Sequence, residues 1–190
     1  MRILLATLLL LIGTTISFAC GNPLLWAMLF KKVPEAKAVY EAEMSARSEG
    51  LITARVYDAK PGQPYHSWSK AWLLTLAKEM QPAVSDVLHP DETLDILLAD
   101  EVAVLSFSKN AEPVFISAGG LRNVERYDLI TTINALKDAW RTELTYGELV
   151  EHALVSGDHE GMAQKLTRIF HVRSGVDLKR SAQNRMPRRL

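Results

Sequence analysis

The sequence predicts an α+β fold, in which a small, mainly antiparallel sheet of about four strands is covered by helices and the C-terminal third is helical. Two observations support this fold class. Three short apolar and β-branched runs follow one another in mid-chain between turn residues. Helical patterns precede and follow this region, and strands segregated from helices in this way are typical of α+β domains.

The first nineteen residues have the pattern of a secretory signal peptide. Arg2 supplies the positive start, residues 3–12 are apolar and uncharged, and Ser17 and Ala19 are the small residues that a signal peptidase requires. The apolar run is shorter than the roughly 20 residues of a membrane-spanning helix. We therefore expect residues 1–19 to be removed, and the mature chain to begin at Cys20 in the periplasm or cell envelope, or as a secreted protein.

Two other fates of the leader stay open. Cys20 directly follows the cleavage site, as the lipid-bearing cysteine of a bacterial lipoprotein does, although Ser17 and Phe18 depart from the leucine and small residue of such signals. An uncleaved anchor is the third alternative, because a second apolar block spans residues 24–30. Pro23 interrupts the continuity between the two blocks, which favours cleavage.

Length and composition indicate one globular domain, at residues 20–175, followed by a basic and flexible tail at residues 176–190. Of the 190 residues, 48% are hydrophobic and 23% are charged, as in ordinary soluble domains. Cys20 is the only cysteine, so a disulfide within the chain, a redox pair and a thiolate zinc cluster are excluded. We expect no metal, no cofactor and no nucleic-acid partner. The tail, which we take as solvated, has five cations in its last twelve residues: Lys179, Arg180, Arg185, Arg188 and Arg189.

Helices and one strand are predicted before the central sheet. Residues 34–48 are rich in Ala and Glu, Pro34 suits the first turn of a helix, and Gly50 suits the position after its end. Residues 51–57 are predicted to be a strand. A second helix begins at a Ser67 or Ser69 cap and ends at Pro82, with apolar residues at every fourth position: Trp68, Trp72, Leu76 and Met80.

Three strands and three helices complete the chain. Residues 93–98, 102–107 and 114–117 are predicted to form antiparallel hairpins, because the turns between them are short. A helix beginning near Tyr127 has one apolar side, and a capping box at Thr145 and Glu148 starts a helix that ends at Gly157. Asp158 caps the last helix. The inward residues of the first and last of these helices are Leu129, Ile133, Leu136 and Trp140, then Met162, Leu166, Ile169 and Phe170.

The hairpin turn at residues 108–112, the strand after it, the pair Gly119 and Gly120 and the next helix resemble the closing hairpin and helix of thioredoxin-like domains. The resemblance covers only this part of the chain. It lacks the redox cysteines and the proline that precedes such a hairpin. It implies a thioredoxin-like α/β domain without redox cysteines as the alternative fold.

Two clusters of polar residues are candidate sites. The first is Tyr65, His66, Ser67 and Trp68, after a loop rich in proline and glycine, which we rank first for a ligand. The second is an acidic corner around His152 and His159. Neither cluster has the spacing of a metal motif or of a nucleophile elbow, so helix capping and a solvated surface are the simpler interpretations.

The apolar segment after the leader is the third candidate. As a helix, residues 24–30 would have apolar groups on every side. The segment therefore either packs into its own domain or docks onto a protein partner or a membrane surface. Of these two alternatives we favour docking. The predicted contact residues are Leu24, Leu25, Trp26, Leu29, Phe30, Lys31 and Lys32.

The sequence thus favours an exported, non-enzymatic binding or assembly module. The alternative is a small periplasmic hydrolase or metal-dependent enzyme that uses His66 and Ser67, or the corner around His152 and His159.

Overall fold

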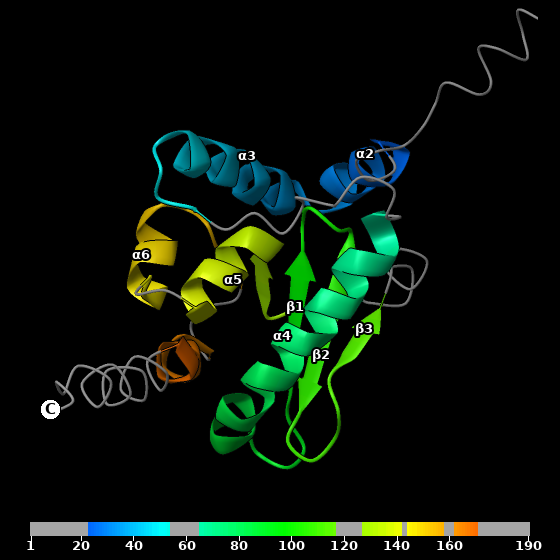
Figure 1. The fold of residues 1–190 in the computed structure, drawn as a ribbon, viewed down its shortest axis with the longest axis vertical. Helices are drawn as coiled ribbons and strands as arrows, with labels where there is room; N and C mark the ends of the chain where they lie inside the picture. The colour runs from blue at the N-terminus through cyan, green and yellow to red at the C-terminus, as the bar shows by residue number, and fades with distance from the viewer. Residues whose placement is uncertain (1–22, 54–64, 117–126, 142–143, 158–161, 171–190) are drawn as a thin grey trace, which may run out of the picture.

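The computed structural model describes residues 23–53, 65–116, 127–141, 144–157 and 162–170, and at its centre lies one mixed sheet (Figure 1). The sheet order is β3-β2-β1-β4. β1 pairs antiparallel with β2 and parallel with β4, and β2 pairs antiparallel with β3. The α+β class predicted from the sequence is therefore confirmed. The strands are β1 (Thr93–Leu98), β2 (Ala103–Ser108), β3 (Val114–Ile116) and β4 (Leu129–Thr131).

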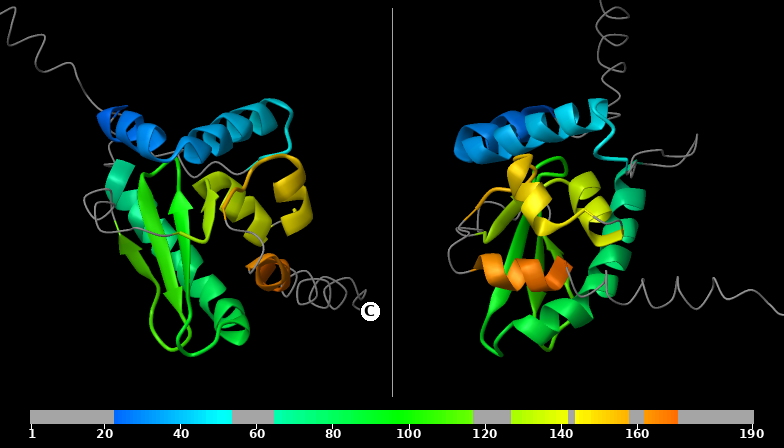
Figure 2. Two further views of the ribbon diagram at one scale, coloured as in Figure 1. Left: turned by 180° about the vertical axis from the view of Figure 1, so that it is seen from behind. Right: turned by 90° about the vertical axis from the view of Figure 1, so that its left-hand side faces the viewer.

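Helices lie on both sides of the sheet (Figures 1 and 2). They are α2 (Pro23–Lys32), α3 (Pro34–Ser48), α4 (Tyr65–Val87), α5 (Ile133–Arg141) and α6 (Tyr146–Glu151), and residues 162–170 are also helical. Successive strand residues point to opposite faces, so each face has its own apolar cluster. Leu97, Val104 and Ile130 pack with α2 and α3, whereas Ile96, Leu105 and Leu129 pack with the other helices.

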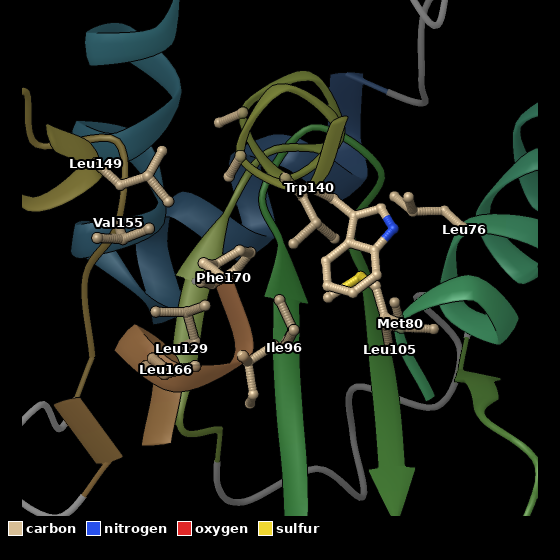
Figure 3. Packing of buried hydrophobic residues seen from close by; sticks show 14 of the residues in the cluster. Leu76, Met80, Ile96, Leu105, Leu129, Trp140, Leu149, Val155, Leu166 and Phe170 are labelled. Atoms are coloured by element: carbon tan, nitrogen blue, oxygen red, sulfur yellow. The ribbon is translucent and has the colours of Figure 1, made fainter. Parts of the chain in front are cut away.

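The larger cluster lies between the sheet, α4, α5, α6 and residues 162–170. Trp140 of α5 belongs to it, with Leu76 and Met80 of α4 beside its indole ring (Figure 3). Leu166, Ile169 and Phe170 are buried in the same cluster, as predicted for the inward side of the last helix. The helical C-terminal third is thus present in part, because residues 171–190 lie outside the described ranges.

The helix predicted from Tyr127 is wrong in its first turn, where the chain forms β4. The backbone of Ile130 exchanges hydrogen bonds of 2.6 and 3.0 Å with the backbone of Ser156. The other edge of β4 pairs with β1. The chain becomes helical only at Ile133, where the Thr132 hydroxyl accepts a hydrogen bond from the backbone amide of Ala135. Ile133, Leu136 and Trp140 are buried as expected.

The other corrections concern where elements begin and end. Residues 51–53 are not a strand, and the rest of the strand predicted at 51–57 lies outside the described residues. α4 already includes Ser67, which therefore is not its cap, and it continues past Pro82 to Val87. α6 ends at Glu151 rather than at Gly157. The chain after it leaves the helical path, and Leu154 and Val155 are buried in the core.

Several local predictions are confirmed. Pro34 lies at the start of α3, and Gly50 after it has a φ of 78°. Thr145 and Glu148 form both hydrogen bonds of the capping box of α6. The predicted leader, Cys20 and the C-terminal tail lie outside the described residues. None of the helices in the described ranges combines the length and the apolar character needed to cross a membrane.

Candidate functional site

The inner side of α2 is part of the folded domain. Leu29 is 4% exposed, and Leu25, Trp26 and Phe30 are half-buried against the cluster that contains Leu97 and Val104. The sequence left open whether this segment packs onto its own domain, and the structure shows that these four side chains do.

An aromatic contact and a hydrogen bond fix the orientation of α2. The rings of Trp26 and Phe30 lie 5.3 and 5.9 Å from that of Tyr40 on α3, measured between centroids. The indole Nε1 of Trp26 donates to the backbone oxygen of Asp100 at 3.2 Å. Because these partners lie on α3 and in the turn between β1 and β2, α2 is held to two other parts of the fold.

The outer side of α2 faces solvent. Ala27, Met28, Lys31 and Lys32 are exposed, with Met28 at 53%. The segment therefore packs onto its own domain along one side, and contact of its exposed side with a protein partner or a membrane surface stays a prediction. Of the seven predicted contact residues, the two lysines are exposed, four face the domain, and the side chain of Leu24 lies outside the described part.

A group of buried acids lies near the start of α5 and was not singled out from the sequence. Both oxygens of the Asp100 carboxylate accept a hydrogen bond from the backbone amide of Ile133, each at 3.1 Å. Glu43 of α3 accepts from the Asn134 side chain at 2.9 Å, and Asp138 accepts from the Thr53 amide at 2.7 Å. These hydrogen bonds join α3 and the β1–β2 turn to α5, which indicates a structural role.

The spacing of α3 could have revealed one of these acids. Ala36, Val39 and Ala46 form the buried side of this helix, and Glu43 continues the same three- and four-residue spacing. A carboxylate on the buried side of a helix needs a partner in the interior. The sequence does not identify Asn134 as that partner, because the two residues are 91 positions apart.

The first-ranked ligand site, Tyr65 to Trp68, forms the first turn of α4. The side chains of these four residues and the loop before them lie outside the described part of the chain. The structure thus places their backbone on a helix and leaves their proposed role in ligand binding as a prediction.

The acidic corner is only partly described. His152 is an exposed residue at the end of α6, whereas His159 lies outside the described residues. Glu148 accepts from the amide and the hydroxyl of Thr145 at 2.7 and 2.8 Å, and these hydrogen bonds, the amide first, lower its pKa. In the described ranges, no three His, Cys, Asp or Glu residues are grouped so that they could hold a metal ion.

A groove of about 370 Å³ lies between α4 and the β2–β3 turn. The Gln81 amide donates to Ser85 Oγ and to the Ser108 oxygen, and Ser85 donates to the Lys109 oxygen at 2.7 Å. Lys109 Nζ in turn donates to the Leu88 oxygen at 2.9 Å. These groups attach α4 to the hairpin, which explains how the helix continues beyond Pro82.

No protein-family model, no curated protein and no solved structure matches this chain. The outer side of α2 combines a large apolar side chain with two exposed cations on one helix that contains no acid. Cations beside an apolar side chain also occur on helices that contact a membrane or a protein partner.

Proposed function

We propose that the protein is exported and acts outside the cytoplasm as a non-enzymatic binding or assembly module, with α2 as its contact surface. The observation that carries this proposal is the exposed side of α2, directly after the predicted leader. Pro23, at which α2 begins, lies three positions after Cys20. A chain of this length reaches at most about 11 Å, so the contact surface stays close to the site of cleavage.

The packing of α2 supports a role in binding. Leu29 and Trp26 hold the helix against the sheet, so its outer side is already ordered before a partner arrives. Binding to such a surface does not require a flexible segment to fold, which lowers the entropic cost of association.

Export is tested with a reporter enzyme that is active only outside the cytoplasm. Fusion of residues 1–19 to the reporter is expected to give activity, because the apolar run carries the targeting information. The matched control is the same fusion with Leu9→Arg, which places a charge in the middle of that run. Equal activity of the two fusions, or no activity from either, would refute export by this leader.

The mass of the mature protein tests the fate of the leader. An unmodified chain beginning at Cys20 is expected. A mass increased by acyl chains would establish a lipoprotein, and a chain that retains residues 1–19 would establish an uncleaved anchor. Both outcomes would overturn the predicted processing and leave the exported location intact.

A further inference from the structure

We propose that the turn between β1 and β2, residues 99–102, couples the docking of α2 to the start of α5, so that release of α2 from the sheet loosens the first turn of α5. The turn lies at the end of β1 that is next to α2 and α3 (Figure 1). The coupling is a conformational property of the fold. It requires neither export nor a partner, so its test is independent of the proposed function.

The last residue of the turn, Val102, has a strained backbone conformation. Its φ is 52°, in the left-handed region that hairpin turns usually fill with glycine or asparagine and that is unfavourable for a β-branched residue. A residue keeps such a conformation only where the surrounding structure holds it. Val102 is buried in the same apolar cluster as Leu29 of α2 and Val33. The packing of α2 against this cluster therefore helps to maintain the turn.

Asp100 connects the turn to both helices. Its backbone oxygen accepts from the Trp26 indole of α2 at 3.2 Å, and its carboxylate accepts from the Ile133 amide at the start of α5 at 3.1 Å. The amide of Ala99 donates to the backbone of β4 at 2.8 Å, which fixes the first residue of the turn to the sheet. Relaxation of Val102 must then be taken up by the residues after Ala99, so it moves the Asp100 carboxylate away from α5.

The hydrogen bond from Trp26 sets the size of the coupling. Loss of one typical intramolecular hydrogen bond changes a local equilibrium by roughly fivefold. The strain at Val102 favours the relaxed turn by a factor of about five or more once that bond is lost. We therefore expect the open form of the α5 start to become about fivefold more populated when the Trp26 donor is removed.

Native-state hydrogen exchange of the purified protein, followed by NMR, tests the coupling. The Ile133 amide reports on the start of α5. The Ile130 amide, which donates to the Ser156 oxygen at 2.6 Å, is the reference, because loss of global stability raises both exchange rates alike. Trp26→Phe removes the indole donor and keeps an aromatic ring. It should raise the ratio of the Ile133 rate to the Ile130 rate by about fivefold.

Phe30→Leu is the matched control on the same helix. Phe30 contacts the ring of Tyr40 on α3 and has no polar group that could hydrogen-bond to the turn, so this variant should leave the ratio unchanged. An unchanged ratio in Trp26→Phe, or an equal rise in both variants, would overturn the inference.

Val102→Gly tests the part played by the strained residue. Glycine adopts this φ without strain, so Trp26→Phe should no longer change the ratio when it is combined with Val102→Gly. A fivefold rise that persists in the combined variant would refute the role of Val102. If Val102→Gly does not fold, the comparison of Trp26→Phe with Phe30→Leu still decides whether α2 and α5 are coupled.

Discussion

Replacement of Leu29 by alanine tests whether α2 belongs to the folded domain. Leu29 is 4% exposed and lies in the cluster of Val33, Val39 and Val104. Truncation of a buried leucine costs about 2–5 kcal/mol, and the lower half of that range applies where neighbours can close the cavity. Because the neighbouring side chains of Leu25 and Phe30 are only half-buried and can move to close part of the cavity, we expect the free energy of unfolding to fall by about 2–3 kcal/mol.

Urea unfolding of the mature chain, followed by circular dichroism, measures this change. The matched control is Met28→Ala on the same helix, where the side chain is 53% exposed. We expect it to change the free energy of unfolding by less than about 0.5 kcal/mol. Equal and small effects of both substitutions would refute the packing of α2 on the sheet, and with it the fixed orientation of Met28, Lys31 and Lys32.

Two further predictions concern the C-terminal half. Gly157 has a φ of 138°, and a Cβ there would lie 2.5 Å from the backbone oxygen of Asp128. Gly157→Ala should therefore lower the free energy of unfolding, measured in urea, by about 1–3 kcal/mol. An unchanged midpoint of unfolding would contradict the close contact beside β4. The pKa of Glu148 is lowered in the folded state, so its stabilising effect is present above its usual pKa of 4.5 and is lost as the pH falls through the folded value. The melting temperatures of the native protein and Glu148→Gln should therefore converge in acid, and a difference that grows as the pH falls would contradict the capping box.

The features predicted correctly from the sequence depend on neighbouring residues. The box at Thr145 and Glu148 needs only residues three positions apart, and Pro34 sets the start of α3 by its own ring geometry. The hairpin strands β1 and β2 are joined by a short turn, which fixes their antiparallel pairing. Local chemistry was sufficient for these elements and for the fold class.

The predicted start of the third helix was wrong because the pattern of apolar residues there fits both a helix and a strand. Leu129 continues the helical spacing of Ile133 and Leu136, yet Leu129, Ile130 and Thr131 are all buried, as in a strand covered on both faces. The parallel pairing of these residues with β1, together with the hydrogen bonds between Ile130 and Ser156, decides between them. Both partners are far along the chain, so periodicity alone could not identify the strand.

The end of α4 shows a similar conflict between local and distant effects. Pro82 cannot donate to the Lys78 carbonyl, which is why the sequence predicts a stop there. Ala83, Val84 and Leu88 are nevertheless buried in the larger cluster, and Ser85 hydrogen-bonds to Lys109. The continued contact with the sheet outweighs the lost hydrogen bond.

Distant partners also change the interpretation of α2. The sequence assigns seven residues of this segment to a docking surface, but the partner of the Trp26 indole lies 74 positions away and could not be foreseen. With Trp26, Leu29 and Phe30 facing the domain, the exposed side keeps one large apolar side chain and two cations. The proposed contact must then be mainly electrostatic. Association of the mature chain with the partner of this surface should consequently weaken as the salt concentration rises, whereas an exposed Trp26 and Phe30 would have made it less sensitive to salt.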